Sequence, residues 1–165
     1  GTVMSNLGLE HALKAESIEF LRAKVGDRYV LEMLRETGGV IGGETSGHMI
    51  VLDRTTTGDG LVSALQILAV MKQTGKSLSE LAAGMPRYPQ TMVNVRTEKK
   101  LDPDASTPIQ EAVGAAENEL RDSGRVVLRA SGTEPVIRVM VEGEDEAQVT
   151  ALAQRLADVV AKAAA

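Results

Sequence analysis

The sequence predicts two domains: a partial three-layer-type α/β domain over residues 1–86, incomplete at its N-terminus, and a small α+β domain over residues 87–165. In the first half, short apolar runs alternate with stretches of helical periodicity, which is typical of α/β layers around a largely parallel sheet. The stretch 75–89 then concentrates glycine and proline around one short helix, which indicates a domain boundary near Pro86. Beyond it, the pattern β-α-β-β-α favours an antiparallel sheet with helices on one face.

In the first domain we expect four strands and four helices. Apolar residues from Leu61 to Met71 recur at helical spacing, and Asp59 or Thr57 is suited to begin that helix. Gly38-Gly39 is suited to end the preceding helix. The expected strands cover 2–5, 18–24, 40–41 and 49–52, and the expected helices begin after Asn6, at Asp27 as its cap, at 57–59 and at Ser77.

In the second domain the expected strands are 91–97, 126–130 and 136–142. A helix begins at Pro108, and a final helix begins near Glu144, each with apolar residues at helical spacing. The connection between the last two strands is a short turn rich in polar residues. This turn is therefore the natural place for chemistry in the second domain.

Composition excludes several classes of function. The net charge is −5 and aromatic residues make up 2 % of the chain, so we expect neither a broad nucleic-acid surface nor an aromatic stacking platform. Cysteine is absent, which excludes disulfides and thiol chemistry and suits a cytoplasmic protein. No apolar run approaches the roughly 20 residues that span a bilayer, and no signal peptide is visible. The first residues have the pattern of a strand interior, so we expect the chain to be a piece of a longer protein.

The segment Arg129-Ala-Ser-Gly-Thr-Glu-Pro135, followed by Arg138, is suited to hold a phosphate. Guanidinium groups bind phosphate through paired, charge-assisted hydrogen bonds. Strand alternation places the side chains of residues 129 and 131 on one face, and the glycine lets successive N–H groups form an anion nest. An ordinary hairpin turn with a surface Arg–Glu134 pair is an equally open interpretation. The candidate phosphate ligands are Arg129, Ser131, Gly132, Thr133 and Arg138.

A second group, Gly42-Gly-Glu-Thr-Ser-Gly-His48, places a carboxylate, two hydroxyls and an imidazole on a loop between two short strands. Carboxylates and hydroxyls are suited to read sugar hydroxyls, although a flexible solvated turn also fits. A Ser46–His48 nucleophile and base is disfavoured because no Gly-x-Ser-x-Gly elbow is present. Asp27 and Arg28, at a loop-to-helix junction, are weaker candidates for ligand contact.

No metal site is predicted. His11 and His48 lack the spacing of metal ligands, and the two carboxylates of Asp102-Pro-Asp104 fit a solvated turn better than a Mg²⁺ site.

These motifs resemble the carboxyl-terminal part of the phosphohexomutase family, most closely its bacterial phosphoglucosamine branch. Residues 129–138 resemble the phosphate-binding loop of the family's fourth domain, and Gly43-Glu-Thr-Ser-Gly-His48 resembles the sugar-binding loop of its third domain. Segments 2–10, 25–30 and 56–60 match that branch as well. One departure is Thr45, which stands where the family pattern leads us to expect Gln.

The resemblance implies a four-domain isomerase that interconverts glucosamine 6-phosphate and glucosamine 1-phosphate through a phosphoserine and a bisphosphate intermediate, assisted by Mg²⁺. A phosphomannomutase or phosphoglucomutase, or a non-catalytic sugar-phosphate-binding module, is the alternative. The serine and Asp-x-Asp-x-Asp loops of the family are absent from these residues, so we expect no catalytic or metal-binding residue here and no activity of the chain alone. The implied partners are a phosphosugar, the N-terminal domains and, in the full-length protein, a second subunit of a homodimer. The implied sugar-binding residues are Glu44, Ser46, His48, Asp27 and Arg28, and the implied phosphate-binding residues are Arg129, Ser131, Gly132, Thr133 and Arg138.

Overall fold

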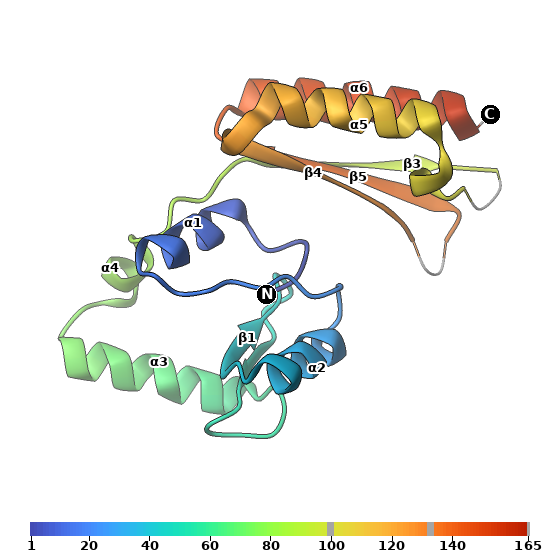
Figure 1. Cartoon of the computed structure of the whole chain (residues 1–165). Coiled ribbons are helices and arrows are strands. Elements are labelled where there is room, and N and C mark those ends of the chain that lie inside the picture. Colours follow the sequence, from blue (N-terminus) through green and yellow to red (C-terminus); the bar gives the residue numbers. More distant parts are fainter. Residues whose placement is uncertain (99–100, 132–133, 165) are drawn as a thin grey trace. The chain divides into compact units, whose positions relative to one another are not determined.

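A computed structural model describes residues 1–98, 101–131 and 134–164 (Figure 1). The chain divides into two compact units, Gly1–Pro86 and Arg87–Ala165. Within the described residues, no helix combines the length and the apolar character that crossing a membrane requires.

The second unit has the expected order β-α-β-β-α, which confirms the prediction. Its sheet has the order β3-β5-β4, and β5 is antiparallel to both neighbours. Helices α5 and α6 both lie on the same face of this sheet (Figure 1). The elements are β3 (Gln90–Arg96), the 3-10 turn η1 (Pro103–Ala105), α5 (Thr107–Leu120), the 3-10 turn η2 (Arg121–Ser123), β4 (Gly124–Ala130), β5 (Val136–Gly143) and α6 (Glu146–Ala164).

Alternation along β5 sorts its side chains between two faces. Ile137, Val139 and Val141 are buried in the core beneath the helices. The intervening residues of β5, Arg138 among them, therefore belong to the opposite face of the sheet. On this second face Met140 and Glu142 are buried, whereas Arg138, near the beginning of β5, is half-buried.

The first unit is built from four helices and one hairpin. Its elements are α1 (Leu7–Ala15), α2 (Asp27–Thr37), β1 (Ile41–Gly43), β2 (Met49–Val51), α3 (Gly60–Thr74) and α4 (Leu78–Ala82). Asp59 accepts hydrogen bonds from two N–H groups at the start of α3, and Ser77 forms a capping box with Glu80 at the start of α4. Gly38 ends α2 in the left-handed conformation, with φ +72°. The predicted beginnings and ends of these helices are thus largely confirmed.

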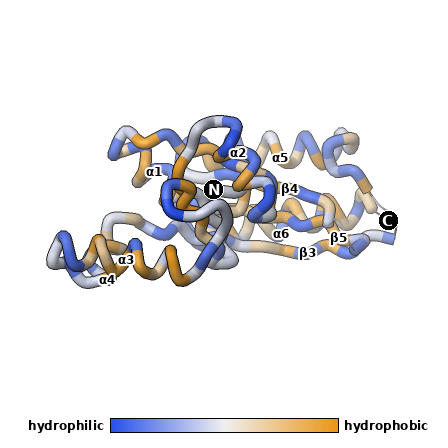
Figure 2. Tube along the Cα trace, turned by 90° about the horizontal axis from the view of Figure 1, so that it is seen from below, coloured by the Kyte–Doolittle hydropathy of each residue, from blue (hydrophilic) through white to orange (hydrophobic). Residues whose placement is uncertain are grey.

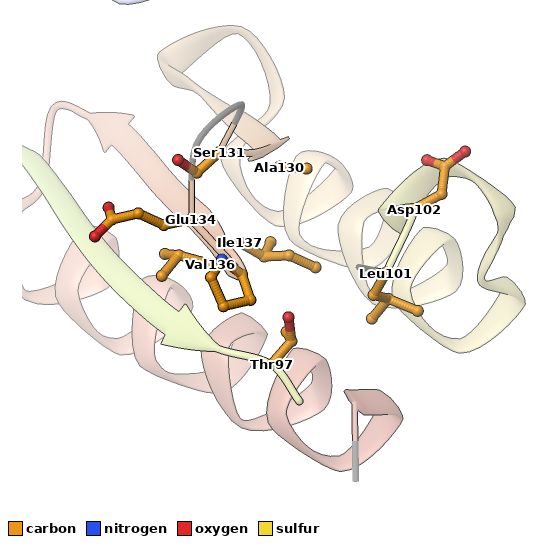
Figure 3. Close-up of a pocket in the computed structure, with 9 residues that line it drawn as sticks. Thr97, Leu101, Asp102, Ala130, Ser131, Glu134, Val136 and Ile137 are labelled. Atoms are coloured by element: carbon orange, nitrogen blue, oxygen red, sulfur yellow. The ribbon is translucent and has the colours of Figure 1, made fainter. Parts of the chain in front are cut away.

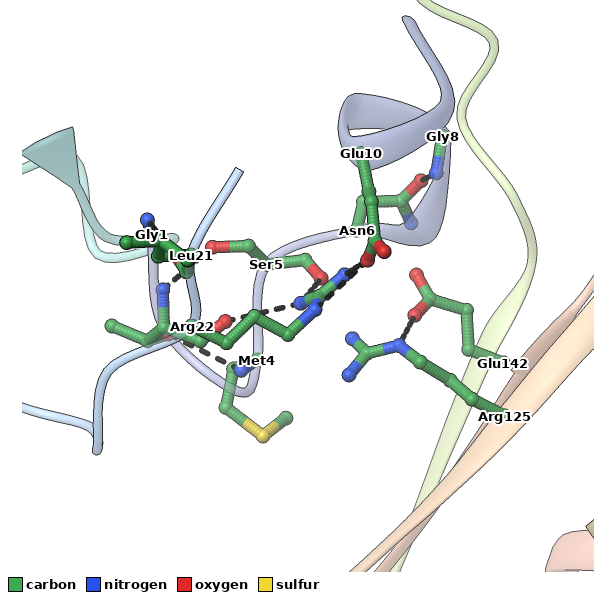
Figure 4. A network of polar contacts seen from close by, with 11 residues as sticks. Gly1, Met4, Ser5, Asn6, Gly8, Glu10, Leu21, Arg22, Arg125 and Glu142 are labelled. Atoms are coloured by element: carbon green, nitrogen blue, oxygen red, sulfur yellow. Dashed lines mark hydrogen bonds and ion pairs between the residues drawn. The ribbon is translucent and has the colours of Figure 1, made fainter. Parts of the chain in front are cut away.

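The prediction of a largely parallel sheet in the first unit is wrong. β1 and β2 are antiparallel, and among the described residues the segments 2–5 and 18–24 share only a single parallel bridge, between Thr2 and Ala23. The Arg22 guanidinium donates to the backbone oxygens of Thr2 and Ser5, at 3.1 and 2.7 Å, and also binds Glu10 (Figure 4). The oxygen of Thr2 also accepts from the N–H of Ser5 at 2.9 Å, so both of its lone pairs are used within this turn and by Arg22.

Asp27 also differs from its prediction as a helix cap. Gly26, at φ +131°, occupies the cap position, and this residue has no side chain that could bond the first N–H groups. Asp27 is instead the first helical residue, and its Oδ1 accepts from the N–H of Arg28 at 2.8 Å. A carboxylate in the first helical turn still favours the helix through the dipole.

Helix α3 exposes leucine rather than burying it. Leu61, Leu65 and Leu68 follow one another at helical spacing and are 80 %, 61 % and 57 % exposed, whereas Ser63 on another face is buried. Figure 2 shows the apolar segments along this helix. We call these three residues the α3 leucine stripe.

Candidate functional site

Two arginines face one another across the β4–β5 hairpin. Arg129 and Arg138 are register partners, so their side chains project on the same face, the one opposite α5 and α6. The Nε of Arg129 is buried and has no hydrogen-bond partner among the described residues. Burial, and secondarily the positive charge of Arg138, lower the pKa of Arg129. This pair therefore has a cationic group in need of an acceptor.

Ser131 follows the end of β4 and lies on the wall of a cavity of about 380 Å³. Its hydroxyl-bearing side chain is buried, and its N–H donates to the oxygen of Val136 at 2.8 Å. Figure 3 shows the apolar residues Leu101 and Ile137 in this cavity, and Glu134 on the side away from Leu101. Because β4 ends at Ala130, strand alternation does not extend to Ser131.

Arg129 and Arg138 are not among the residues that line this cavity. Gly132 and Thr133, the two remaining candidates, lie outside the described residues.

The loop between β1 and β2 joins Glu44, Ser46 and His48 into one hydrogen-bonded chain. The Oγ of Ser46 lies 3.3 Å from Oε2 of Glu44 and 3.0 Å from Nδ1 of His48. The backbone closes the same loop, because the N–H of Glu44 donates to the oxygen of His48 at 3.0 Å. All three side chains are exposed or half-buried, so a ligand can reach them.

The loop is also tied to the beginning of α2. Oε1 of Glu44 accepts from the N–H of Gly26 at 2.6 Å. Asp27 and Arg28 follow directly, so residues that lie far apart in the sequence meet in the structure. Arg28 is exposed and forms an i,i+4 ion pair with Glu32 at 3.3 Å.

Gly26 is a further candidate site residue, because its N–H holds the Glu44 carboxylate. The signal for it was a glycine immediately before a helix, at a position that requires a positive φ.

The described residues contain no group of three histidine, cysteine, aspartate or glutamate side chains that is able to hold a metal ion.

Two family models match this chain, one over each of the two units. Residues 1–88 match the family model of phosphoglucomutase/phosphomannomutase, alpha/beta/alpha domain III, and residues 92–159 match that of the C-terminal domain. The chain belongs to the phosphoglucomutase/phosphomannomutase family. The resemblance drawn from the two loops is thereby confirmed.

Similar members of the phosphoglucomutase/phosphomannomutase family carry the name phosphoglucosamine mutase. The protein of Methylococcus capsulatus is 58 % identical over 163 residues, which are 99 % of this chain and 36 % of that protein. The protein of Proteus mirabilis is 58 % identical over 160 residues, with 97 % of this chain and 36 % of that protein covered. The chain thus spans 36 % of the length of these relatives.

Two solved structures share the fold of this chain. N-acetylphosphoglucosamine mutase of Aspergillus fumigatus superposes with a TM-score of 0.84 at 19 % identity, covering 99 % of this chain and 38 % of that one. A phosphoglucomutase/phosphomannomutase family protein of Burkholderia thailandensis gives 0.71 at 24 % identity, covering 98 % and 37 %. These likenesses confirm the mixed α/β and α+β fold class.

Proposed function

We propose that this chain is the sugar- and phosphate-holding part of a phosphoglucosamine mutase, an isomerase that interconverts glucosamine 6-phosphate and glucosamine 1-phosphate. The name rests on the relatives that are 58 % identical. The physical observation that carries the proposal is the Arg129–Arg138 pair, with its unpartnered Nε. Like charges directly opposite one another on paired strands are unfavourable, and a bound phosphate relieves that repulsion.

In this proposal the hairpin holds the phosphate that is not being transferred. Arg129 and Arg138 donate to its oxygens, and Ser131, Gly132 and Thr133 contribute hydroxyl and backbone donors. Glu44 and Ser46 accept from sugar hydroxyls, with His48, Asp27 and Arg28 nearby. A phosphosugar must bind in two orientations to be isomerised. A phosphate-binding site remote from the reacting end can position either isomer.

Phosphate titration of the chain tests the hairpin. Replacing Arg129 by Ala removes a charge-assisted contact worth roughly 1.5–3 kcal/mol, so affinity for phosphate or glucosamine 6-phosphate falls about tenfold or more. Arg155→Ala is the matched control, because Arg155 lies on α6 in an exposed ion pair with Glu119 at 2.6 Å. Isothermal titration calorimetry measures both variants. Equal affinity of the parent and the Arg129 variant overturns the assignment.

The phosphoserine and the Mg²⁺ of the reaction belong, in this proposal, to other domains of the full-length protein. That protein is a cytoplasmic enzyme, and the metal supplies electrostatic stabilisation of phosphoryl transfer when it is bound. We therefore expect the purified 165-residue chain to show no mutase turnover in a coupled assay. Turnover above the background of a mock preparation would sink this expectation.

The substrate is tested by competition in the full-length enzyme. We expect glucosamine phosphates to be converted in preference to glucose or mannose phosphates. The reverse preference assigns the chain to a sister mutase. Phosphosugar binding without any turnover of the full-length protein favours a non-catalytic binding module.

A further inference from the structure

The loop between β1 and β2 contains a hydrogen-bond chain whose direction is fixed by its protons. Ser46 Oγ stands between Oε2 of Glu44 and Nδ1 of His48, at 3.3 and 3.0 Å. A hydroxyl has one proton to donate, and an ionised carboxylate has none. The contact between Ser46 and Glu44 therefore takes the serine proton.

The contact between Ser46 and His48 must then take its proton from the imidazole. A neutral imidazole carries its hydrogen on either Nδ1 or Nε2. Both contacts of Ser46 are satisfied together only when Nδ1 of His48 carries the hydrogen and donates it to the serine oxygen. If Nε2 carried it, Ser46 would have one proton for two acceptors.

At the Glu44 end of this hydrogen-bond chain, a backbone N–H holds the carboxylate. Oε1 of Glu44 accepts from the N–H of Gly26 at 2.6 Å, so the two oxygens of this carboxylate have different tasks. One oxygen ties the loop to the beginning of α2, and the other receives the serine proton. The anchor keeps the carboxylate from rotating away from Ser46.

We propose that His48 is a positioning residue: through its Nδ1–H it turns the Ser46 hydroxyl toward Glu44, so that the loop offers acceptor atoms only. This inference rests on the proposed function for the identity of the ligand. With its proton already donated, Ser46 presents a lone pair, and Glu44 presents lone pairs as well. The loop then selects a sugar edge whose hydroxyl or ammonium groups donate, and it rejects a carbonyl or ether oxygen at the same place.

The position of the histidine proton is measured on the chain itself, without substrate. Long-range ¹H–¹⁵N correlation spectra separate protonated from unprotonated ring nitrogens, and the chain has only 2 histidines. His11→Gln leaves His48 as the single signal. At about pH 8 we expect the Nδ1–H form to predominate. Predominance of the Nε2–H form overturns the proposal.

Three variants test the direction of the hydrogen bonds between Glu44, Ser46 and His48. Ser46→Ala removes the acceptor, so His48 reverts to the Nε2–H form that an isolated imidazole prefers. Glu44→Gln, with its amide oxygen held by the Gly26 N–H, turns an NH₂ group toward Ser46. The serine then donates to His48, and the tautomer inverts. Thr45→Ala is the control in the same loop, and the tautomer stays unchanged there. An unchanged tautomer in Ser46→Ala or Glu44→Gln contradicts the proposal.

A second experiment tests whether the direction of these hydrogen bonds affects substrate binding. The amide nitrogen of Asn occupies the place of Nδ1 and is a donor, whereas Gln places its amide nearer to the position of Nε2. In the full-length enzyme we expect His48→Asn, which keeps a donor at the place of Nδ1, to raise KM less than His48→Gln does. His48→Gln should raise KM about tenfold, the value of one lost hydrogen bond, with a smaller change in kcat. Equal KM values for both variants overturn the positioning role.

The two experiments fail separately. If the protein isomerises another substrate or none, the KM comparison loses its basis while the tautomer measurement still decides the hydrogen-bond direction. If the tautomer is Nε2–H and the enzyme nevertheless converts glucosamine phosphates, the proposed function stands and this inference does not.

Discussion

The partial burial of the charged Arg129 side chain is unfavourable for folding of the second unit. Its Nε has no partner among the described residues, and burial followed by the charge of Arg138 lowers its pKa. A cation whose folded pKa lies below its unfolded pKa costs stability at every pH below the folded value, and that cost disappears only as pH rises through it. Because arginine stays protonated throughout the pH range in which proteins are handled, this cost persists throughout that range.

Replacing Arg129 by Met should therefore stabilise the chain while removing phosphate binding. Methionine retains most of the apolar stem and removes both the unpartnered nitrogen and the repulsion from Arg138. We expect a higher free energy of unfolding for this variant, measured by urea denaturation. Arg155→Met, in an exposed ion pair, should change stability little. A loss of stability in the Arg129 variant would show that the side chain holds the fold together.

At the scale of single elements, local rules predicted the helices well and the strands of the first unit poorly. Caps such as Asp59 and Ser77 act within one turn, so the sequence displays them. The segment 18–24 has strand composition, yet Arg22 uses its guanidinium to bind backbone oxygens 17 and 20 positions away. No local pattern reveals such a partner, and β-propensity depends strongly on context.

The candidate site divides in the same way. Residue types and their order predict candidate sites at the 42–48 loop and the 129–138 hairpin, and the site roles of these residues stay predictions. The bond from Gly26 to Glu44 is not predicted in this way, because it joins positions 18 apart through a backbone N–H that has no side-chain signature.

Two glycines in helices should respond to alanine in opposite directions. A Cβ on Gly8 in α1 would stand 1.7 Å from the backbone oxygen of Pro86, which cannot move without shifting the chain. A Cβ on Gly114 in α5 would meet nothing within 4 Å outside its own helix. We expect Gly114→Ala to stabilise by roughly 0.5–1 kcal/mol through helix propensity, and Gly8→Ala to destabilise in spite of it.

Thermal unfolding followed by circular dichroism checks this pair of variants. An increase of the melting temperature in both variants would mean that the close approach of the segment at Pro86 to α1 contributes nothing to stability.

For the whole molecule, the two units have very different cores. Among the described residues, the core cluster of the second unit contains 13 buried residues, and that of the first unit contains Ala23, Val30, Leu34 and Ile50. Stability follows the apolar surface that is removed from water. The second unit should therefore be the more stable of the two.

Limited proteolysis measures this difference. We expect trypsin to digest the first unit while a product close to residues 87–165 accumulates, because cleavage follows the population of the open form. Mass spectrometry identifies the surviving product. Survival of the first unit instead would contradict the ranking by core size.

The α3 leucine stripe has a consequence for solubility. Salts such as ammonium sulfate are excluded from protein surfaces and strengthen the tendency of exposed apolar groups to leave water. The chain should therefore precipitate at a lower ammonium sulfate concentration than a variant with Leu61→Gln and Leu65→Gln. Ala64→Gln with Ala69→Gln, two exposed positions of the same helix, is the control and should keep the parental curve. Coincident curves for all three proteins would contradict this. In this interpretation the α3 leucine stripe sets the ammonium sulfate concentration at which the chain precipitates, although its residues bind no ligand in the proposed function.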